Sequence, residues 1–173
     1  GGMIYPGLTQ TFVGDHDGNY AASGEPSPTP PLMLPLALLS HQTSPPQSAT
    51  LANWGVVTNH YTPNYPNGCV AVLLHNAGAD MSSWYPWMVS PLLHDGWGVF
   101  VPDMPGHGQS PGEKSWDPWP DITNDTVSYL QNMYGYDCGL FIGSSIGANT
   151  ALAACAAWPG WCVGVVALSP GLD

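Results

Sequence analysis

The chain has 173 residues, of which 44% are hydrophobic, so it is long enough to bury one hydrophobic core. Asp, Glu, Lys and Arg make up only 8% of the residues, and the formal net charge is −11. Lys114 is the single basic side chain apart from the histidines, so little is available to neutralise phosphates, and we expect neither nucleic acid nor an anionic membrane surface as a partner.

Residues 1–49 are rich in glycine, serine and proline and predict an extended arm or linker. Seven prolines between residues 26 and 46 favour extended backbone and oppose helix formation. Residues 15–19 match the first positions of a calcium-binding loop. The glycine comes too early, however, and the glutamate of the last position is missing, so a plain turn is expected. The apolar stretch 31–39 is too short and proline-broken to span a bilayer.

Residues 50–173 alternate between short apolar runs and segments of helical length, a pattern typical of βαβ units. The sequence therefore predicts an α/β domain with a mostly parallel sheet and helices on both faces. We expect strands at residues 70–74, 98–101, 140–142 and 163–168, and helices at residues 84–93, 121–134 and 148–157. A glycine-rich loop, residues 105–108, follows the second of these strands.

The four cysteines, Cys69, Cys138, Cys155 and Cys162, allow three complete pairings, and the sequence does not choose among them. Three of them stand just before an apolar run, so they would line up along one end of a parallel sheet. A disulfide between Cys69 and Cys138 is then sterically conceivable, and it would favour an oxidising compartment. Buried unpaired cysteines fit the sequence equally well.

Two glycines flank the most informative serine of the chain in the pentapeptide Gly143–Gly147. An apolar run precedes the pentapeptide, and a stretch of small residues that favours helix follows it. Glycines two residues before and two residues after Ser145 permit a sharp turn from strand to helix. Such a turn lifts the serine hydroxyl above the edge of the sheet, where a nucleophile can reach a substrate.

Four segments, taken together, resemble successive landmarks of the α/β-hydrolase superfamily. They are residues 73–78 (LLHNAG), 103–110 (DMPGHGQS), 143–149 (GSSIGAN) and 168–173 (LSPGLD). They are most similar to the dienelactone-hydrolase-like and carboxylesterase-like members, and the resemblance covers residues 55–173. The order and the spacing of the four motifs make the resemblance specific, whereas a single G-x-S-x-G motif would be weak evidence for the family.

The resemblance implies that Ser145 is a nucleophile that attacks the carbonyl carbon of an ester or a similar compound. If the protein is an enzyme, we expect its substrate to be a small, uncharged ester. The backbone N–H groups of Ile146 and Ala77 would hold the negative oxygen that develops. No metal ion and no cofactor is expected for such a reaction.

Three further residues, His75, Asn76 and His107, belong to the loops that shape the site in relatives. Neither histidine corresponds to the family's base, and we expect both to hydrogen-bond loop backbone. Asn76 stands where many members have glycine, and Pro105 stands where arginine is frequent.

The family's acid and its histidine base normally follow later in the chain than the motifs found here. Asp173, the last residue given, comes too early to be that acid, so neither the base nor the acid is present. We therefore expect a fold truncated after the strand 163–168, which would leave an open sheet edge. Three explanations remain open: the full product is longer, a second chain completes the sheet and site, or the domain is an inert scaffold.

Two functional hypotheses follow from this sequence. The first is a serine hydrolase of esterase type. The second is a catalytically inert hydrolase-fold subunit of an extracellular filament or multi-subunit assembly, in contact with other chains through the open edge and the arm. Low charge and four cysteines favour a secreted or extracytoplasmic protein, although the sequence given shows no signal peptide.

Overall fold

The computed structural model describes residues 12–14, 20–22 and 44–171. The chain divides into two compact units, residues 1–41 and 42–173. In the first unit, β1 (Phe12–Gly14) and β2 (Tyr20–Ala22) pair as antiparallel strands. The turn expected at residues 15–19, the apolar stretch 31–39 and Asp173 lie outside the described residues.

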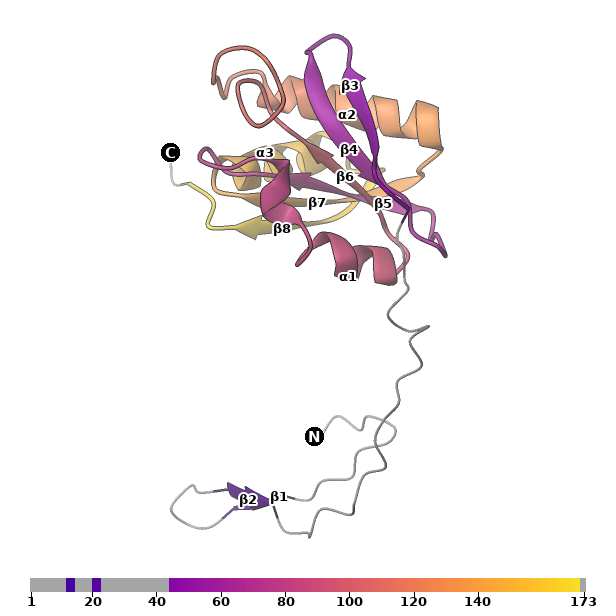
Figure 1. The fold of residues 1–173 in the computed structure, drawn as a ribbon, viewed down its shortest axis with the longest axis vertical. Helices are drawn as coiled ribbons and strands as arrows, with labels where there is room; N and C mark the ends of the chain where they lie inside the picture. Colours follow the sequence, from indigo (N-terminus) through magenta and orange to yellow (C-terminus); the bar gives the residue numbers. More distant parts are fainter. Residues whose placement is uncertain (1–11, 15–19, 23–43, 172–173) are drawn as a thin grey trace. The chain divides into compact units, whose positions relative to one another are not determined.

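The second unit is built on a six-stranded sheet with the strand order β3-β4-β6-β5-β7-β8 (Figure 1). The strands are β3 (Gln47–Leu51), β4 (Val56–Tyr61), β5 (Cys69–Leu74), β6 (Gly98–Pro102), β7 (Cys138–Ser144) and β8 (Cys162–Leu168). The last four pair in parallel, while β3 and β4 join one edge as antiparallel strands. The predicted α/β fold with a mostly parallel sheet is confirmed.

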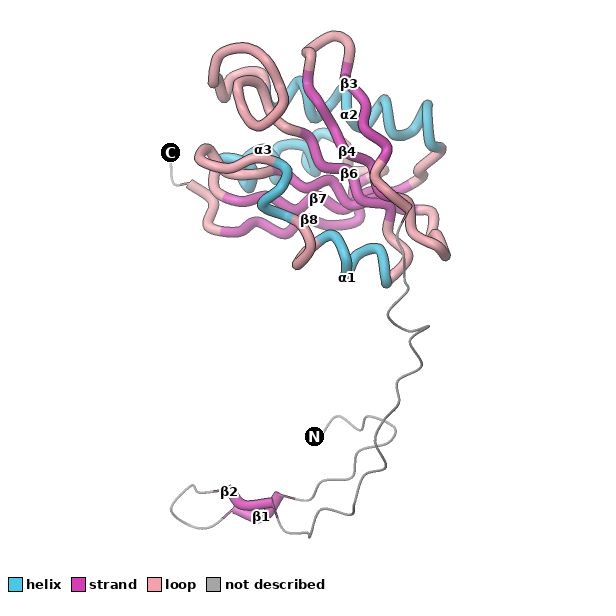
Figure 2. The backbone as a smooth tube through the Cα atoms, in the orientation of Figure 1, coloured by secondary structure: helices cyan, strands magenta, loops and turns pink. Residues whose placement is uncertain are grey.

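Helices cover both faces of this sheet, also as predicted (Figure 2). They are the 3-10 helix η2 (Met81–Trp84) and α1 (Val89–His94) on one face, and α2 (Trp119–Tyr134) and α3 (Ile146–Ala157) on the other. Side chains of β5 alternate between the two cores: Val70 and Val72 pack toward α2 and α3, whereas Ala71 and Leu73 pack toward η2 and α1. None of the described helices is long and apolar enough to cross a membrane.

Two local predictions were wrong. The helix expected at residues 84–93 is divided into η2 and α1, because Pro86 disfavours helical backbone at Tyr85, which is extended. Strands β3 and β4 were also not predicted from the sequence. Two of the three inward-facing side chains of β4 are polar, Thr58 and His60, and this hides the alternation of apolar and polar residues that marks a strand.

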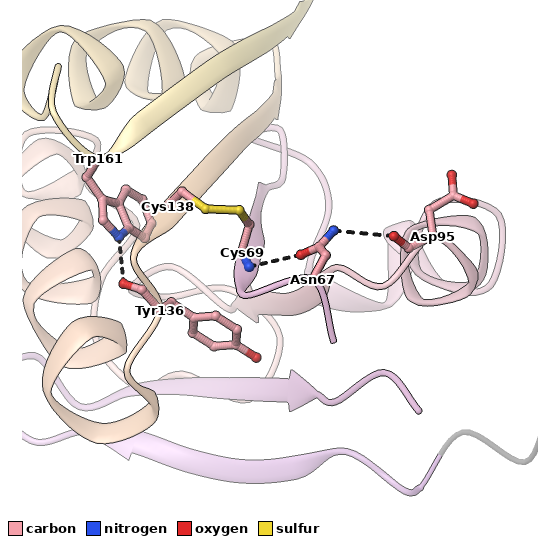
Figure 3. Close-up of a disulfide and its surroundings, with 6 residues drawn as sticks. All are labelled: Asn67, Cys69, Asp95, Tyr136, Cys138 and Trp161. Carbon is pink, nitrogen blue, oxygen red and sulfur yellow. Dashed lines mark hydrogen bonds between the residues drawn. A yellow bond between two sulfur atoms is a disulfide. The ribbon is translucent and has the colours of Figure 1, made fainter. Parts of the chain in front are cut away.

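The cysteines form two disulfides, Cys69–Cys138 and Cys155–Cys162, and the described residues include no free cysteine. Cys69 and Cys138 are register partners on β5 and β7, with Cα atoms 4.7 Å apart, so the alignment expected at the sheet's end is confirmed (Figure 3). The second disulfide ties the end of α3 to the start of β8. The alternative of buried unpaired cysteines is therefore wrong.

Removal of the longer-range disulfide should destabilise the protein more than removal of the shorter one. The Cys69–Cys138 link spans 69 residues and the Cys155–Cys162 link spans 7, so chain entropy predicts losses of about 4 and about 2.5 kcal/mol respectively. Urea unfolding of the two double cysteine-to-alanine variants measures both losses. An equal or smaller loss for the Cys69–Cys138 variant would contradict this account.

His60 is a buried polar group in the core next to α2. Its Nε2 lies 2.9 Å from the Tyr136 hydroxyl, and its ring centroid lies 4.0 Å from that of Tyr134. Burial lowers the pKa of His60 from 6.5 to about 4, because the charged imidazolium would lose its hydration. The folded protein therefore keeps His60 neutral at pH values where an unfolded chain already begins to protonate it.

This difference predicts an acid-sensitive stability. The contribution of neutral His60 is complete above pH 6.5 and is lost as the pH falls toward 4, with a slope of up to about 1.4 kcal/mol per pH unit. The variant His60→Gln should lose less stability than the parent between pH 6.5 and 4.5, as measured by urea unfolding. His94→Gln, on the exposed end of α1, is the matched control. Identical pH profiles for the parent and His60→Gln would refute the assignment.

Candidate functional site

Ser145 lies at the turn between β7 and α3, in the strand-to-helix turn that the sequence predicts. Its backbone has φ 54° and ψ −120°, a conformation that residues other than glycine rarely adopt. Hydrogen bonds on both sides hold it: its N–H donates to the Leu168 carbonyl at 2.9 Å, and its carbonyl accepts from the Ala148 N–H at 2.8 Å. The Ser145 side chain is exposed and makes no hydrogen bond with the described residues.

The two flanking glycines are needed because backbone segments touch there. A Cβ on Gly143 would collide with the carbonyl of Gly147, and a Cβ on Gly147 would collide with the carbonyls of Leu74 and His75. The N-terminus of α3 therefore packs directly on the carboxyl end of β5. Any side chain at either glycine would push the helix away from the sheet and move Ser145.

The candidate oxyanion donors lie at the same edge of the sheet. Leu74 of β5 is the register partner of Gly143 of β7, so the loops that follow these two strands are neighbours. Ile146 is the first residue of α3, a position whose N–H has no partner within the helix. Ala77 lies exposed in the loop after β5, where the Asn76 side chain accepts the Gly78 N–H at 2.9 Å.

His75 is fully buried beneath this loop, and both of its ring nitrogens are engaged. Nε2 accepts the Met104 N–H at 3.1 Å, so the proton resides on Nδ1, which donates to the Asn76 carbonyl at 2.8 Å. Burial lowers the pKa of His75, and the hydrogen bond to Asn76 offsets part of this effect. The ring is therefore neutral and is not placed to take a proton from Ser145.

The hydrogen bond from His75 also sets the direction of the Ala77 N–H. The Asn76 carbonyl and the Ala77 N–H belong to one planar peptide unit, in which the two groups point in opposite directions. Because His75 holds the carbonyl inward, the Ala77 N–H faces away from the core. His75 thus acts on the candidate oxyanion donor without touching a substrate.

His107 holds the next carbonyl of the same loop. Its Nε2 lies 3.1 Å from the Ala77 carbonyl oxygen and its Nδ1 lies 2.9 Å from the Pro105 carbonyl oxygen. The ring is buried, and its centroid is 4.9 Å from that of His75. Two neighbouring imidazoles therefore bind two successive carbonyls, and they join the loop after β5 to the loop after β6.

Asp103 is a buried residue of the site whose role was not predicted from the sequence. Its carboxylate accepts the N–H groups of Met81 and Gln109, each at 2.7 Å, so it ties η2 to the loop after β6. A Cβ on Gly108 would collide with this carboxylate. The signal available in the sequence was an aspartate after a strand, followed by glycines at residues 106 and 108, which leave room for a buried carboxylate.

The described residues contain no group of three or more His, Cys, Asp or Glu side chains that could hold a metal ion. The candidate site contains the exposed Ser145 hydroxyl, backbone N–H groups and a supporting layer of hydrogen-bonded side chains.

Residues 70–173 match the family model of the alpha/beta hydrolase fold, and the chain therefore belongs to the α/β-hydrolase family. No curated protein is detectably similar to it. Solved structures with a similar fold include an esterase from Pyrococcus furiosus, with a TM-score of 0.60 and 23% identity, over 78% of this chain and 54% of the esterase.

Two further solved structures also have a fold similar to that of this chain. A monoacylglycerol lipase from Paleococcus ferrophilus has a TM-score of 0.56 and 28% identity, over 67% of this chain and 44% of the lipase. A predicted CIB-like hydrolase from Thermoplasma acidophilum has a TM-score of 0.57 and 17% identity, over 73% of this chain and 64% of that protein. The chain thus spans 44% to 64% of the length of these three structures.

The close approach at Gly147 predicts a large loss of stability on substitution. Gly147→Ala should lower the free energy of unfolding by about 2 kcal/mol or more, because the new methyl group meets backbone oxygens that cannot move aside. Gly160→Ala is the control, since an added Cβ there meets nothing within 4 Å and should change stability by less than about 0.5 kcal/mol. Equal stability of the two variants in urea unfolding would contradict the packing described.

Proposed function

We propose that the protein is a serine hydrolase of esterase type, with Ser145 as its nucleophile. The observation that carries this proposal is the backbone of Ser145, held at φ 54° between β7 and α3 with its side chain exposed. Strained backbone of this kind persists only where the surrounding structure enforces it, and it is concentrated at functional sites. The esterase and lipase with similar folds are consistent with ester chemistry.

In the proposed reaction the Ser145 hydroxyl oxygen bonds to the ester carbonyl carbon, and the carbonyl oxygen becomes an oxyanion. The N–H groups of Ile146 and Ala77 stabilise that charge, and the loss of one such donor typically lowers the rate about a hundredfold to a thousandfold. The proton of Ser145 passes to a base and from the base to the leaving oxygen, so the ester C–O bond breaks and the alcohol departs. Water then attacks the acyl group bonded to Ser145 and releases the acid, and the serine hydroxyl is restored. Because His75 and His107 are engaged with loop backbone, we assign the base and its acid partner to residues outside those described.

The net charge of the chain limits the class of substrate that we propose. The chain contains one lysine and no arginine, and its net charge is −11. A substrate with a carboxylate or phosphate would find little to neutralise it and would be repelled at long range. We therefore propose a small, uncharged ester.

The second candidate, an inert hydrolase-fold subunit of an assembly, is supported by the apolar side chains that β8 exposes. Among the described strands β8 pairs only with β7, and it exposes Val163, Val166 and Leu168. Exposed apolar edge strands are sites of pairing with another chain. Under this candidate, Ser145 would not react with an ester-like probe.

We propose an extracytoplasmic location for either candidate. The two disulfides support it, because such bonds persist mainly in oxidising compartments.

A fluorophosphonate, which bonds covalently to activated serines, tests the proposed function. The intact natural protein should gain the mass of one phosphonyl group at Ser145, as located by peptide mass spectrometry. Ser145→Ala should abolish the labelling, because the reacting hydroxyl is gone. Ser48→Ala, on the exposed edge strand β3, should leave labelling unchanged.

Labelling that persists in Ser145→Ala, or natural protein that does not react at all, would overturn the enzymatic proposal. Absence of any reaction would favour the inert subunit.

A further inference from the structure

A small hollow adjoins the nucleophile turn, on the side of η2 and β8. Its volume is about 100 Å³, and it is lined by Asn76, Ser83, Trp84, Trp87, Ser144 and Leu168. None of these six side chains is charged. The hollow thus presents two indole rings and a leucine to an apolar ligand, together with the polar side chains of Asn76, Ser83 and Ser144.

Two tryptophans form the wall of this hollow that belongs to η2 and the chain after it. Trp84 is buried at 2% exposure, whereas Trp87 is 55% exposed, and their ring centroids lie 5.5 Å apart. The Trp87 indole N–H donates to the Ser83 carbonyl at 2.6 Å. This hydrogen bond fixes the Trp87 ring at the rim of the hollow.

Two residues that line the hollow are direct neighbours in the chain of candidate catalytic residues. Asn76 immediately precedes Ala77, the loop oxyanion donor, and Ser144 immediately precedes Ser145. Because residues bonded to Ala77 and Ser145 line the hollow, the carbon chain of an ester whose carbonyl carbon is bonded to the Ser145 oxygen can enter this space. After the alcohol has left, that chain is the acyl group of the ester.

We propose that this hollow is the acyl pocket, that it admits short acyl groups, and that Trp87 sets the upper limit of chain length. A volume of 100 Å³ corresponds to about three water molecules in the liquid, so acyl chains of about two to four carbon atoms fit. Longer chains meet the ring of Trp87. This assignment rests on the proposed function and adds to it the class of substrate, short-chain esters.

A series of fluorophosphonates that carry ethyl, butyl or octyl chains tests the proposal in the intact natural protein. The measured quantity is the second-order rate constant for labelling of Ser145. The octyl probe should react at least about tenfold more slowly than the ethyl probe, because its chain does not fit. Trp87→Ala should raise the ratio of the octyl rate to the ethyl rate about tenfold.

Two further variants sharpen the test. Trp87→Phe keeps an aromatic ring but loses the hydrogen bond to Ser83, so its octyl rate should fall between those of the parent and Trp87→Ala. Tyr65→Ala removes an aromatic side chain that is 85% exposed and does not line the hollow, so its rates should match the parent.

The outcomes separate the two proposals. Labelling of Ser145 at rates that do not depend on chain length, or that Trp87→Ala does not change, would overturn the acyl pocket and leave the proposed function standing. Absence of labelling with every probe would overturn the proposed function itself and the pocket with it.

Discussion

The contact of α3 with the carboxyl end of β5 at Gly147 determines the geometry of the whole candidate site. Helix backbone meets the carbonyls of Leu74 and His75 there without a side chain between them. This contact fixes the first turn of α3, and the first turn fixes the backbone of Ser145 between its hydrogen bonds to β8 and to the helix. One close approach therefore sets the position of the hydroxyl and of the Ile146 N–H relative to three parallel strands.

The loops around that contact are held by hydrogen bonds to backbone rather than by ion pairs, which suits a chain with only 8% charged residues. Two neighbouring histidines bind successive carbonyls of the loop after β5, and the buried Asp103 carboxylate binds two N–H groups from separate segments. Hydrogen bonds of this kind fix the direction of a peptide unit as well as its position. The orientation of the Ala77 N–H is the consequence that bears on its proposed role as an oxyanion donor.

The sequence predicted those elements whose local residue pattern directly reflects their surroundings in the fold. The buried parallel strands are apolar runs because both faces are covered, and the glycines around Ser145 mark a turn that no Cβ permits. The sequence did not reveal β4, because two of its inward side chains are polar, and the hydrogen-bond partners of Thr58 and of His60 Nε2 lie in other segments. Nor did it reveal the role of Asp103, whose partners lie in two segments apart in sequence.

The structure of the protein after reaction with an ethyl fluorophosphonate tests the central claim most directly. The account predicts a bond from the phosphorus atom to the Ser145 oxygen, with the phosphonyl oxygen about 2.7–3.1 Å from the backbone nitrogens of both Ala77 and Ile146. The ethyl group should lie in the hollow beside Trp87. A phosphonyl oxygen that points to solvent, away from both nitrogens, would contradict the account.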